Sequence, residues 1–251
     1  MLRRILITLI STLVLAFVGL FWIAPVTLSY YAAKKAPAVA SIVPRDLTER
    51  SVSQTPGTKL SYFGYEFELP WDDLDETQPQ LYPKEKPNRV VLAFRSGLRV
   101  VVTALPAREW ATNLSAEFKV SPQVIESTFG PEAMRSDYEF IKALYEFTPQ
   151  TMHHWTTSSA VHYREQTLLI IKSLAPLKCA NSGIFNVQNG DFKGFQQGDP
   201  QARHDELAVN LYSDESSIEM IFDETKYRKP GGITQPEINR VIQSLRNKKE
   251  K

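Results

Sequence analysis

The pattern of hydrophobic and polar positions sets the first residues of the chain apart from the rest. Residues 5–24, ILITLISTLVLAFVGLFWIA, contain no charged side chain, and the next charge is Lys34. A helix of about 20 apolar residues is long enough to cross the ~30 Å hydrocarbon core of a bilayer. We therefore expect residues 1–31 to be a membrane anchor that spans the bilayer once, with residues 5–28 in contact with the membrane.

The alternative to an anchor is a signal peptide that is removed. The small residues at 38–40, Ala-Val-Ala, match the pattern of a cleavage site. The apolar stretch of a signal peptide is usually about 7–15 residues long, however, and this run is longer. We expect the anchor to be retained.

Basic residues flank the apolar run on both sides and bear on the orientation of the chain. Arg3 and Arg4 precede the run, as in secretory signals, and favour a cytoplasmic N-terminus. The positive-inside rule also counts the far flank, where the basic residues are Lys34, Lys35, Arg45 and Arg50. The basic residues of the far flank outnumber the two arginines, so the rule does not favour a cytoplasmic N-terminus. We give more weight to the two arginines and expect the rest of the chain outside the cytoplasm, which would be the periplasm if the source is a bacterium.

The remainder of the chain divides into a linker and one domain. Residues 32–58 are rich in Ala, Pro, Ser and Thr and show little periodicity, which is typical of a flexible tether. Residues 59–251 are enough for a single domain with its own core.

Strands are predicted where apolar and polar residues alternate. Residues 63–69 alternate and end at Pro70, and residues 207–211 and 218–222 alternate around a polar turn. Two hairpins are expected at the dipeptides Ser96-Gly97 and Asn189-Gly190. The strands beside Ser96-Gly97, residues 89–95 and 98–105, are nearly continuously apolar, which predicts a pair covered on both faces.

Helices are predicted from capping residues and apolar spacing. Ser121-Pro122 and Gly130 bound one helix, and Ser136 with Glu139 begins another that ends near Phe147. A longer candidate covers residues 158–174, although its LLII stretch also fits a strand. The last helix starts at a Thr234–Glu237 capping box, carries an apolar stripe (Ile238, Val241, Ile242, Leu245) and ends in basic residues (Arg246, Lys248, Lys249).

The order strands, helices, strands, helix predicts an α+β fold, an antiparallel sheet with helices packed on it. The early aromatic strand ending in Pro70-Trp71 and the final amphipathic helix after a strand meander resemble the PsbP-like family of α/β/α sandwiches. The resemblance covers residues 60–248 in outline and implies the architecture alone. The family's functional residues find no match in this chain.

Charge and cysteine content exclude several classes of protein. The formal net charge is +1 and there is no basic stripe, so we expect no nucleic-acid partner. The single cysteine, Cys179, excludes an intramolecular disulfide and is most simply a small buried side chain.

The histidines are the main candidates for chemistry. His153 and His154 are adjacent, and a helix over residues 158–174 would place His162 and Glu165 on one face, as metal ligands or an acid–base pair require. The alternative is a set of solvated histidines at the edge of the core. The sequence holds no G-x-S-x-G, P-loop or G-x-G-x-x-G motif, and we expect neither metal nor cofactor.

A proline-rich connection is the main candidate for recognition. Residues 70–88, PWDDLDETQPQLYPKEKPN, lack any helix or strand period, and long connections of this kind are often functional. The candidate contact residues are two aromatic and four acidic side chains: Trp71, Tyr82, Asp72, Asp73, Asp75 and Glu76. The alternative is a solvated loop with Trp71 in the core. We therefore predict a non-catalytic binding or assembly module with a protein partner, and an enzyme built around the histidines as the alternative.

Overall fold

The computed structural model describes residues 38–75, 79–85, 87–108, 112, 121–151, 165, 167–169, 171–172, 178–190, 192–202, 206–224, 226 and 232–248. The predicted anchor, residues 1–31, lies outside these ranges. Within them, no helix is both long and apolar enough to cross a membrane.

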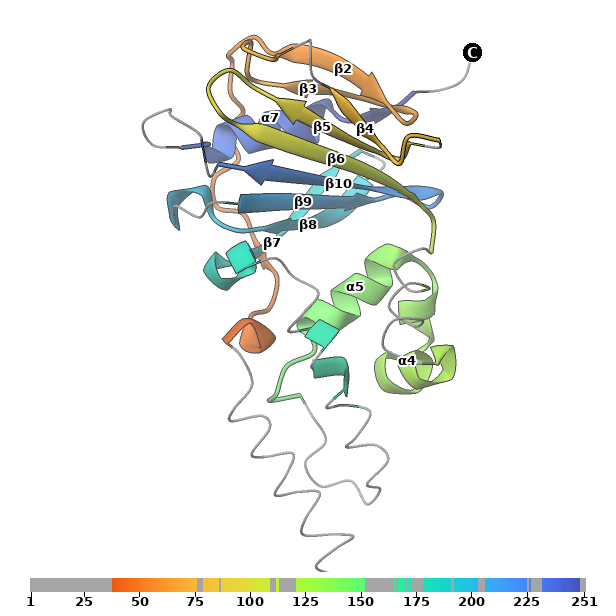
Figure 1. Ribbon diagram of the computed structural model, residues 1–251. Coiled ribbons are helices and arrows are strands. Elements are labelled where there is room, and N and C mark those ends of the chain that lie inside the picture. Colours follow the sequence, from red (N-terminus) through yellow and green to blue (C-terminus); the bar gives the residue numbers. More distant parts are fainter. Residues whose placement is uncertain are drawn as a thin grey trace, which may run out of the picture.

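The structure is an α+β fold built on a large mixed sheet (Figure 1). The strand order of this eight-stranded sheet is β1-β7-β8-β9-β10-β6-β5-β4. Every pairing is antiparallel except that of β1 with β7, which is parallel. The sequence predicted an antiparallel sheet, and this prediction is wrong for the pairing of β1 with β7. The bounds are β1 Arg45–Asp46, β4 Gln80–Tyr82, β5 Arg89–Ala93, β6 Arg99–Pro106, β7 Ile184–Asn189, β8 Phe192–Gln197, β9 Glu206–Tyr212 and β10 Ser216–Asp223.

A second, three-stranded sheet has the order β11-β3-β2, with bounds β2 Thr58–Tyr62, β3 Tyr65–Leu69 and β11 Arg246–Asn247. The turn between β2 and β3 is Phe63-Gly64, whose φ angles are 54° and 82°. Positive φ at both central residues is the type I′ geometry that matches the twist of a hairpin. The strand predicted over 63–69 therefore begins two residues later, at Tyr65.

One face of the large sheet packs against the small sheet and α7 (Gln235–Ser244). The side chains that point inward include Phe67, Leu92 and Met220 of the strands and Ile238 of α7, all at most 3% exposed. The β5–β6 pair was expected to be covered on both faces. It buries Val90 and Val102 fully, whereas Val91 and Val101 on the other face are partly exposed. Burial therefore still alternates between the two faces of these strands, although their sequence is nearly continuously apolar.

The other face of the large sheet carries a second core beneath α4 (Pro122–Phe129) and α5 (Asp137–Glu146). Ile125, Phe140 and Leu144 pack there with Phe195 of β8. Figure 1 shows α4 and α5 together beside the β7–β9 end of the sheet, apart from α7. The described residues also form short 3-10 helices: η2 Ala38–Ser41, η3 Pro131–Met134, η4 Lys178–Ser182 and η5 Pro200–Ala202.

The structure confirms the predicted caps of α5 and α7, whereas Ser121 precedes α4 without a capping hydrogen bond from its side chain. Ser136 Oγ accepts from the Glu139 N–H at 3.2 Å, and the Glu237 carboxylate accepts from the Thr234 N–H at 2.8 Å. The last helix is shorter than predicted because it ends at Ser244 and the chain then pairs with β3. Arg246 still serves the helix end, since its Nη1 donates to the Gln243 and Leu245 carbonyls at 2.7 and 2.6 Å. Of the predicted helix over 158–174, the described residues 165, 167–169 and 171–172 are helical.

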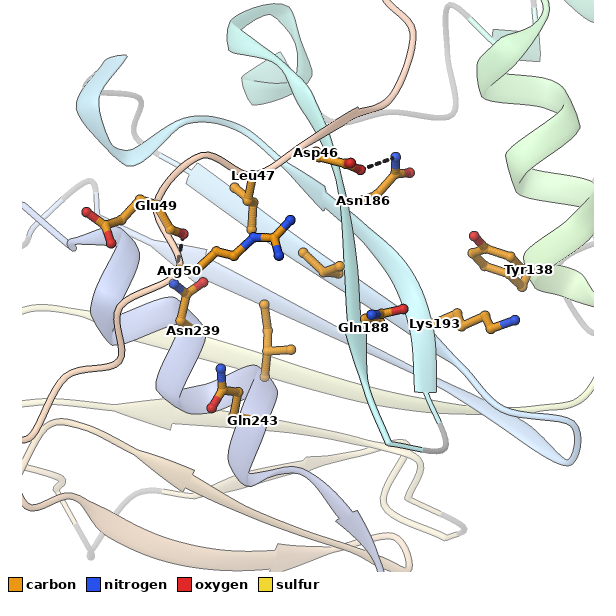
Figure 2. A pocket seen from close by; sticks show the side chains of 12 residues that line it. Asp46, Leu47, Glu49, Arg50, Tyr138, Asn186, Gln188, Lys193, Asn239 and Gln243 are labelled. Carbon is orange, nitrogen blue, oxygen red and sulfur yellow. Dashed lines mark hydrogen bonds between the residues drawn. The ribbon is translucent and has the colours of Figure 1, made fainter.

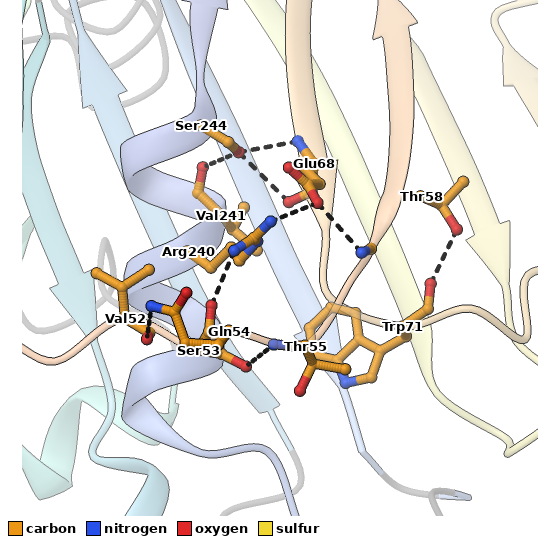
Figure 3. Close-up of polar contacts among 11 residues, drawn as sticks. Val52, Ser53, Gln54, Thr55, Thr58, Glu68, Trp71, Arg240, Val241 and Ser244 are labelled. Carbon is orange, nitrogen blue, oxygen red and sulfur yellow. Dashed lines mark hydrogen bonds and ion pairs between the residues drawn. The ribbon is translucent and has the colours of Figure 1, made fainter.

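Residues 38–58, interpreted from the sequence as part of a tether, make extensive contacts with the domain. Ala40 is fully buried, and β1 adds to the large sheet. Asn239 Nδ2 donates to the carbonyls of Glu49 and Ser51. Arg240 Nη1 donates to the carbonyl of Ser53 (Figure 3). These contacts involve backbone carbonyls, so the apolar pattern of the segment gave no sign of them.

Candidate functional site

The site begins with an incomplete strand pairing at the edge of the large sheet. β1 pairs with β7 only through Arg45↔Phe185 and Asp46↔Asn186. The β7–β8 hairpin closes at Asn189↔Phe192, across a two-residue loop. Because backbone groups alternate sides along a strand, residues 186 and 188 direct their N–H and C=O away from β8. Asn186 meets β1 there, whereas no described strand pairs with the outer edge of β7 at Gln188.

A groove of about 550 Å³ lies along this open edge. Three apolar side chains contribute to it, Leu47, Val187 and Ile242, of which the last two are buried. The other lining residues are polar, charged or aromatic (Figure 2): Asp46, Glu49, Arg50, Tyr138, Asn186, Gln188, Lys193, Asn239 and Gln243.

Regular elements hold most of the polar side chains in place. Asn239 and Gln243 are one turn apart on α7, and Asn186 and Gln188 are two residues apart on β7, so each pair shares a face. Lys193 of β8 is the cross-strand partner of Gln188. The groove therefore presents amide side chains from a helix and from a strand.

Tyr138 closes the groove on the side of α5. Its ring stacks on Phe195 with centroids 5.5 Å apart and planes 12° from parallel. The Lys193 Nζ lies 5.9 Å from the centroid of the same ring, within range of a cation–π contact. Burial raises the pKa of the Tyr138 hydroxyl, which therefore stays protonated at neutral pH.

The anionic side chains of the groove are already engaged. Asp46 Oδ1 accepts from Asn186 Nδ2 at 3.2 Å, and Glu49 Oε1 accepts from the Ser51 N–H at 2.8 Å. Hydrogen bonds from the Ser51 side chain and backbone lower the pKa of Glu49. Both carboxylates therefore have local partners.

Among the described residues, the cationic side chains of Arg50 and Lys193 form no hydrogen bond or ion pair, and neither do the side-chain amides of Gln188 and Gln243. The Lys193 ammonium lies over the Tyr138 ring. Figure 2 shows the Arg50 side chain extending across the groove toward β7. The groove can therefore offer donors from the two cations and both donors and acceptors from the amides.

The histidine site predicted from the sequence lies mostly outside the described residues. His153, His154 and His162 are among those not described, and Glu165 is buried at 2% exposure. Across the described ranges, no group of three or more His, Cys, Asp and Glu side chains is placed to hold a metal ion.

Trp71 of the predicted recognition loop is a core residue. It is 5% exposed, and its ring meets Phe94 and Phe222 edge-on at 5.8 and 6.0 Å between centroids. This is the alternative considered for it from the sequence. A ring held between two phenylalanines cannot also serve as an anchor for a partner.

The acidic part of the same loop runs along the far edge of the large sheet. Asp73 Oδ2 accepts from the Ser96 N–H at 2.6 Å, and the Asp75 N–H donates to the Ala93 carbonyl at 2.9 Å. Asp72 is exposed, Tyr82 on β4 is 44% exposed, and Glu76 lies outside the described residues. The described residues 73–75 therefore lie against the end of β5, and Asp72 and Tyr82 are at the surface.

Cys179 is a buried structural thiol, as expected. It is 1% exposed, and its Sγ donates to the Gln197 carbonyl at 3.4 Å. Burial raises the pKa of the thiol to about 11, so it is protonated at neutral pH and is a poor nucleophile.

The groove residues themselves were missed from the sequence. Arg50 lies in the segment interpreted as a tether, and Asn186, Gln188 and Gln243 occupy the polar positions of amphipathic elements. Such positions are usually solvated surface, and only the folded chain shows that they converge.

Comparison with known proteins gave no match to a family model, a curated protein or a solved structure.

Proposed function

We propose that this chain is a non-catalytic binding or assembly module, held at a membrane by residues 5–28 with its domain outside the cytoplasm, and that it binds its partner in the groove beside β7. The observation that carries the proposal is the convergence of four side chains, those of Arg50, Lys193, Gln188 and Gln243, on one groove without hydrogen-bond or ion-pair partners among the described residues. Polar groups that converge on a concave surface are a common feature of ligand sites.

The chemistry of the groove supports binding in preference to catalysis. Its described lining includes no serine, cysteine or histidine, and its two carboxylates, Asp46 and Glu49, each accept a hydrogen bond from a neighbouring residue. The groups without hydrogen-bond partners are a guanidinium, an ammonium and two carboxamides, all of which are hydrogen-bonding groups. These groups recognise and orient a ligand.

Photo-crosslinking tests the proposed binding site. The full chain, carrying benzoylphenylalanine in place of Gln243, is expressed in the cells from which the gene comes and irradiated. A matched chain carries the same residue in place of Glu132, which is exposed on η3 and does not line the groove. We expect adducts from position 243 and none from position 132. Equal adducts, or none from position 243, would overturn the assignment.

A reporter fusion tests the location of the domain. A reporter that is active only outside the cytoplasm is fused after Lys251. Activity supports the proposed orientation, and an inactive fusion that is cleaved by a cytoplasmic protease reverses it. A mature N-terminus at Ser41 would show that the apolar run is a signal peptide.

The alternative function, an enzyme with a site around His153, His154, His162 and Glu165, has a separate test. We expect the purified full chain to bind no stoichiometric metal and His162→Ala to leave its metal content unchanged. Stoichiometric metal that is lost in His162→Ala would favour the enzyme.

A further inference from the structure

We infer that the groove takes an extended peptide segment bearing carboxylate side chains, which adds as a strand to the open edge of β7. This inference rests on the proposed function, since it names the occupant of the same groove.

The backbone of β7 supplies the first part of the argument. β1 shows that this edge accepts a parallel strand, but it pairs with only two residues of β7 before the chain turns toward α7. The outward N–H and C=O of Gln188 lie just beyond that pairing, beside the groove. Strand addition at such an edge is a recurring mode of peptide recognition, because backbone hydrogen bonds provide affinity independent of sequence.

The side chains on both sides of the edge fit a peptide backbone. Gln243 comes from α7 on one face of the sheet, and Gln188 comes from the opposite face, where Tyr138 and Lys193 also lie. Each amide both donates and accepts, so the pair can bond to peptide groups that point out of the strand ladder. Leu47, Val187 and Ile242 supply a small apolar surface between them.

Charge determines which peptide fits best. Arg50 has no hydrogen-bond or ion-pair partner among the described residues, and Lys193 lies over the Tyr138 ring. Asp46 and Glu49 accept hydrogen bonds from Asn186 and Ser51. The Arg50 guanidinium would donate a charge-assisted hydrogen bond to an acidic side chain of the peptide, and a basic side chain would gain no such bond. Arg50 therefore favours an acidic segment.

Fluorescence anisotropy with defined peptides tests the inference on the full chain in detergent micelles. The probe is a fluorescein-labelled peptide in which Glu and Thr alternate. One comparison peptide has Lys in place of Glu. Two further copies are N-methylated, one at every Glu and one at every Thr, so that each loses the amide hydrogens along one edge.

We expect the Lys peptide to bind at least about tenfold more weakly than the Glu peptide, because it cannot accept the charge-assisted hydrogen bond from Arg50. At least one N-methylated copy should lose a similar factor, because its pairing edge is blocked. Arg50→Gln should weaken the Glu peptide by about tenfold. The matched variant Arg135→Gln, an exposed arginine on the Glu132 side of the molecule, should leave binding unchanged.

A variant of the protein backbone provides an independent check. Gln188→Pro removes the outward N–H of β7 while leaving the hydrogen bonds to β8, and proline is tolerated at a sheet edge. Its melting temperature is measured alongside, and we expect about tenfold weaker binding with the fold retained. If this variant does not fold, the N-methylated peptides carry the same comparison.

Several results would overturn the inference. They are equal binding of the Glu, Lys and N-methylated peptides, no effect of Arg50→Gln, or no binding of the Glu peptide at millimolar concentration. If these occur while position 243 still forms adducts in cells, the groove binds a ligand that is not an acidic peptide and the proposed function stands. If position 243 also forms no adducts, both proposals fail.

Discussion

Arg240 of α7 and Glu68 of β3 form an ion pair with 2.7 Å between Nη2 and Oε1, and this pair ties three separate segments together (Figure 3). The same Glu68 oxygen accepts from the Gly57 N–H at 3.1 Å, and Arg240 Nη1 donates to the Ser53 carbonyl at 2.9 Å. The side chains are 24% and 15% exposed. The final helix is thus bonded to the small sheet and to the segment that leads from β1.

A double-mutant cycle measures the strength of this pair. With Arg240→Leu and Glu68→Gln, we expect a coupling of about 1–2 kcal/mol in the free energy of unfolding, since the pair is partly shielded and shares further hydrogen bonds. The control pair is Arg135–Glu132, whose side chains are 70% and 60% exposed. There we expect about 0–0.5 kcal/mol. Equal coupling in the two cycles would show that the Arg240 contacts add nothing.

The pair also makes stability depend on acid pH. The hydrogen bond from Arg240 is the largest cause that lowers the pKa of Glu68 below its ordinary value. The stabilisation is therefore present above the unfolded pKa of about 4.3 and is lost as pH falls through the lower folded value. Urea titrations between neutral pH and pH 3 should show the difference between the wild type and Glu68→Gln shrinking in acid. A difference that stays constant would contradict this.

Lys172 provides a prediction at alkaline pH. It is fully buried, and its Nζ donates to the carbonyls of Tyr145 and Phe147 at 2.6 and 2.7 Å, at the end of α5. Burial lowers its pKa to about 8. Between that value and the unfolded value of about 10.4 the unfolded chain binds more protons, so stability rises with pH in this window.

Comparison with Lys172→Met separates this effect from the titration of tyrosines. Relative to the variant, the wild type should gain about 1–3 kcal/mol in the free energy of unfolding between pH 7 and pH 10. Urea unfolding of both proteins at each pH gives the difference directly. A difference that falls with pH would mean that the ammonium is better stabilised in the fold than in water.

The two aromatic residues of the loop over residues 70–88 should differ in how much they contribute to stability. Trp71→Ala empties the space between Phe94 and Phe222 and should cost about 3–5 kcal/mol. Tyr82→Ala removes a side chain that is 44% exposed and should change stability by less than about 0.5 kcal/mol. Thermal unfolding monitored by circular dichroism measures both. A stable Trp71→Ala variant would contradict the core assignment.

The sequence predicted the elements that carry their own periodicity and caps. Alternation placed Leu207, Val209 and Leu211 on one buried face, and Ile233 and Ile238 lie in the core beside the predicted capping box of α7. These features are local, because a strand or helix period fixes which side chains share a face whatever the tertiary context.

Other features depend on contacts between distant segments, and sequence patterns do not report those. Asn189 was predicted as a turn residue. It instead ends β7, and its Nδ2 donates to the Ile242 and Leu245 carbonyls at 2.5 and 2.9 Å, at the C-terminal end of α7. β1 was missed because two residues are too few to show alternation, and the groove follows from where β1 stops.

The most direct test of the account asks whether the side chains of Arg50 and Lys193 hold a ligand in the groove in living cells. The full chain with benzoylphenylalanine at position 243 is compared with the same chain carrying Arg50→Gln and Lys193→Gln, at equal expression and with melting temperatures checked. The account predicts about tenfold fewer adducts in the substituted chain with its stability unchanged. An equal yield of the same adducts from both chains would contradict it.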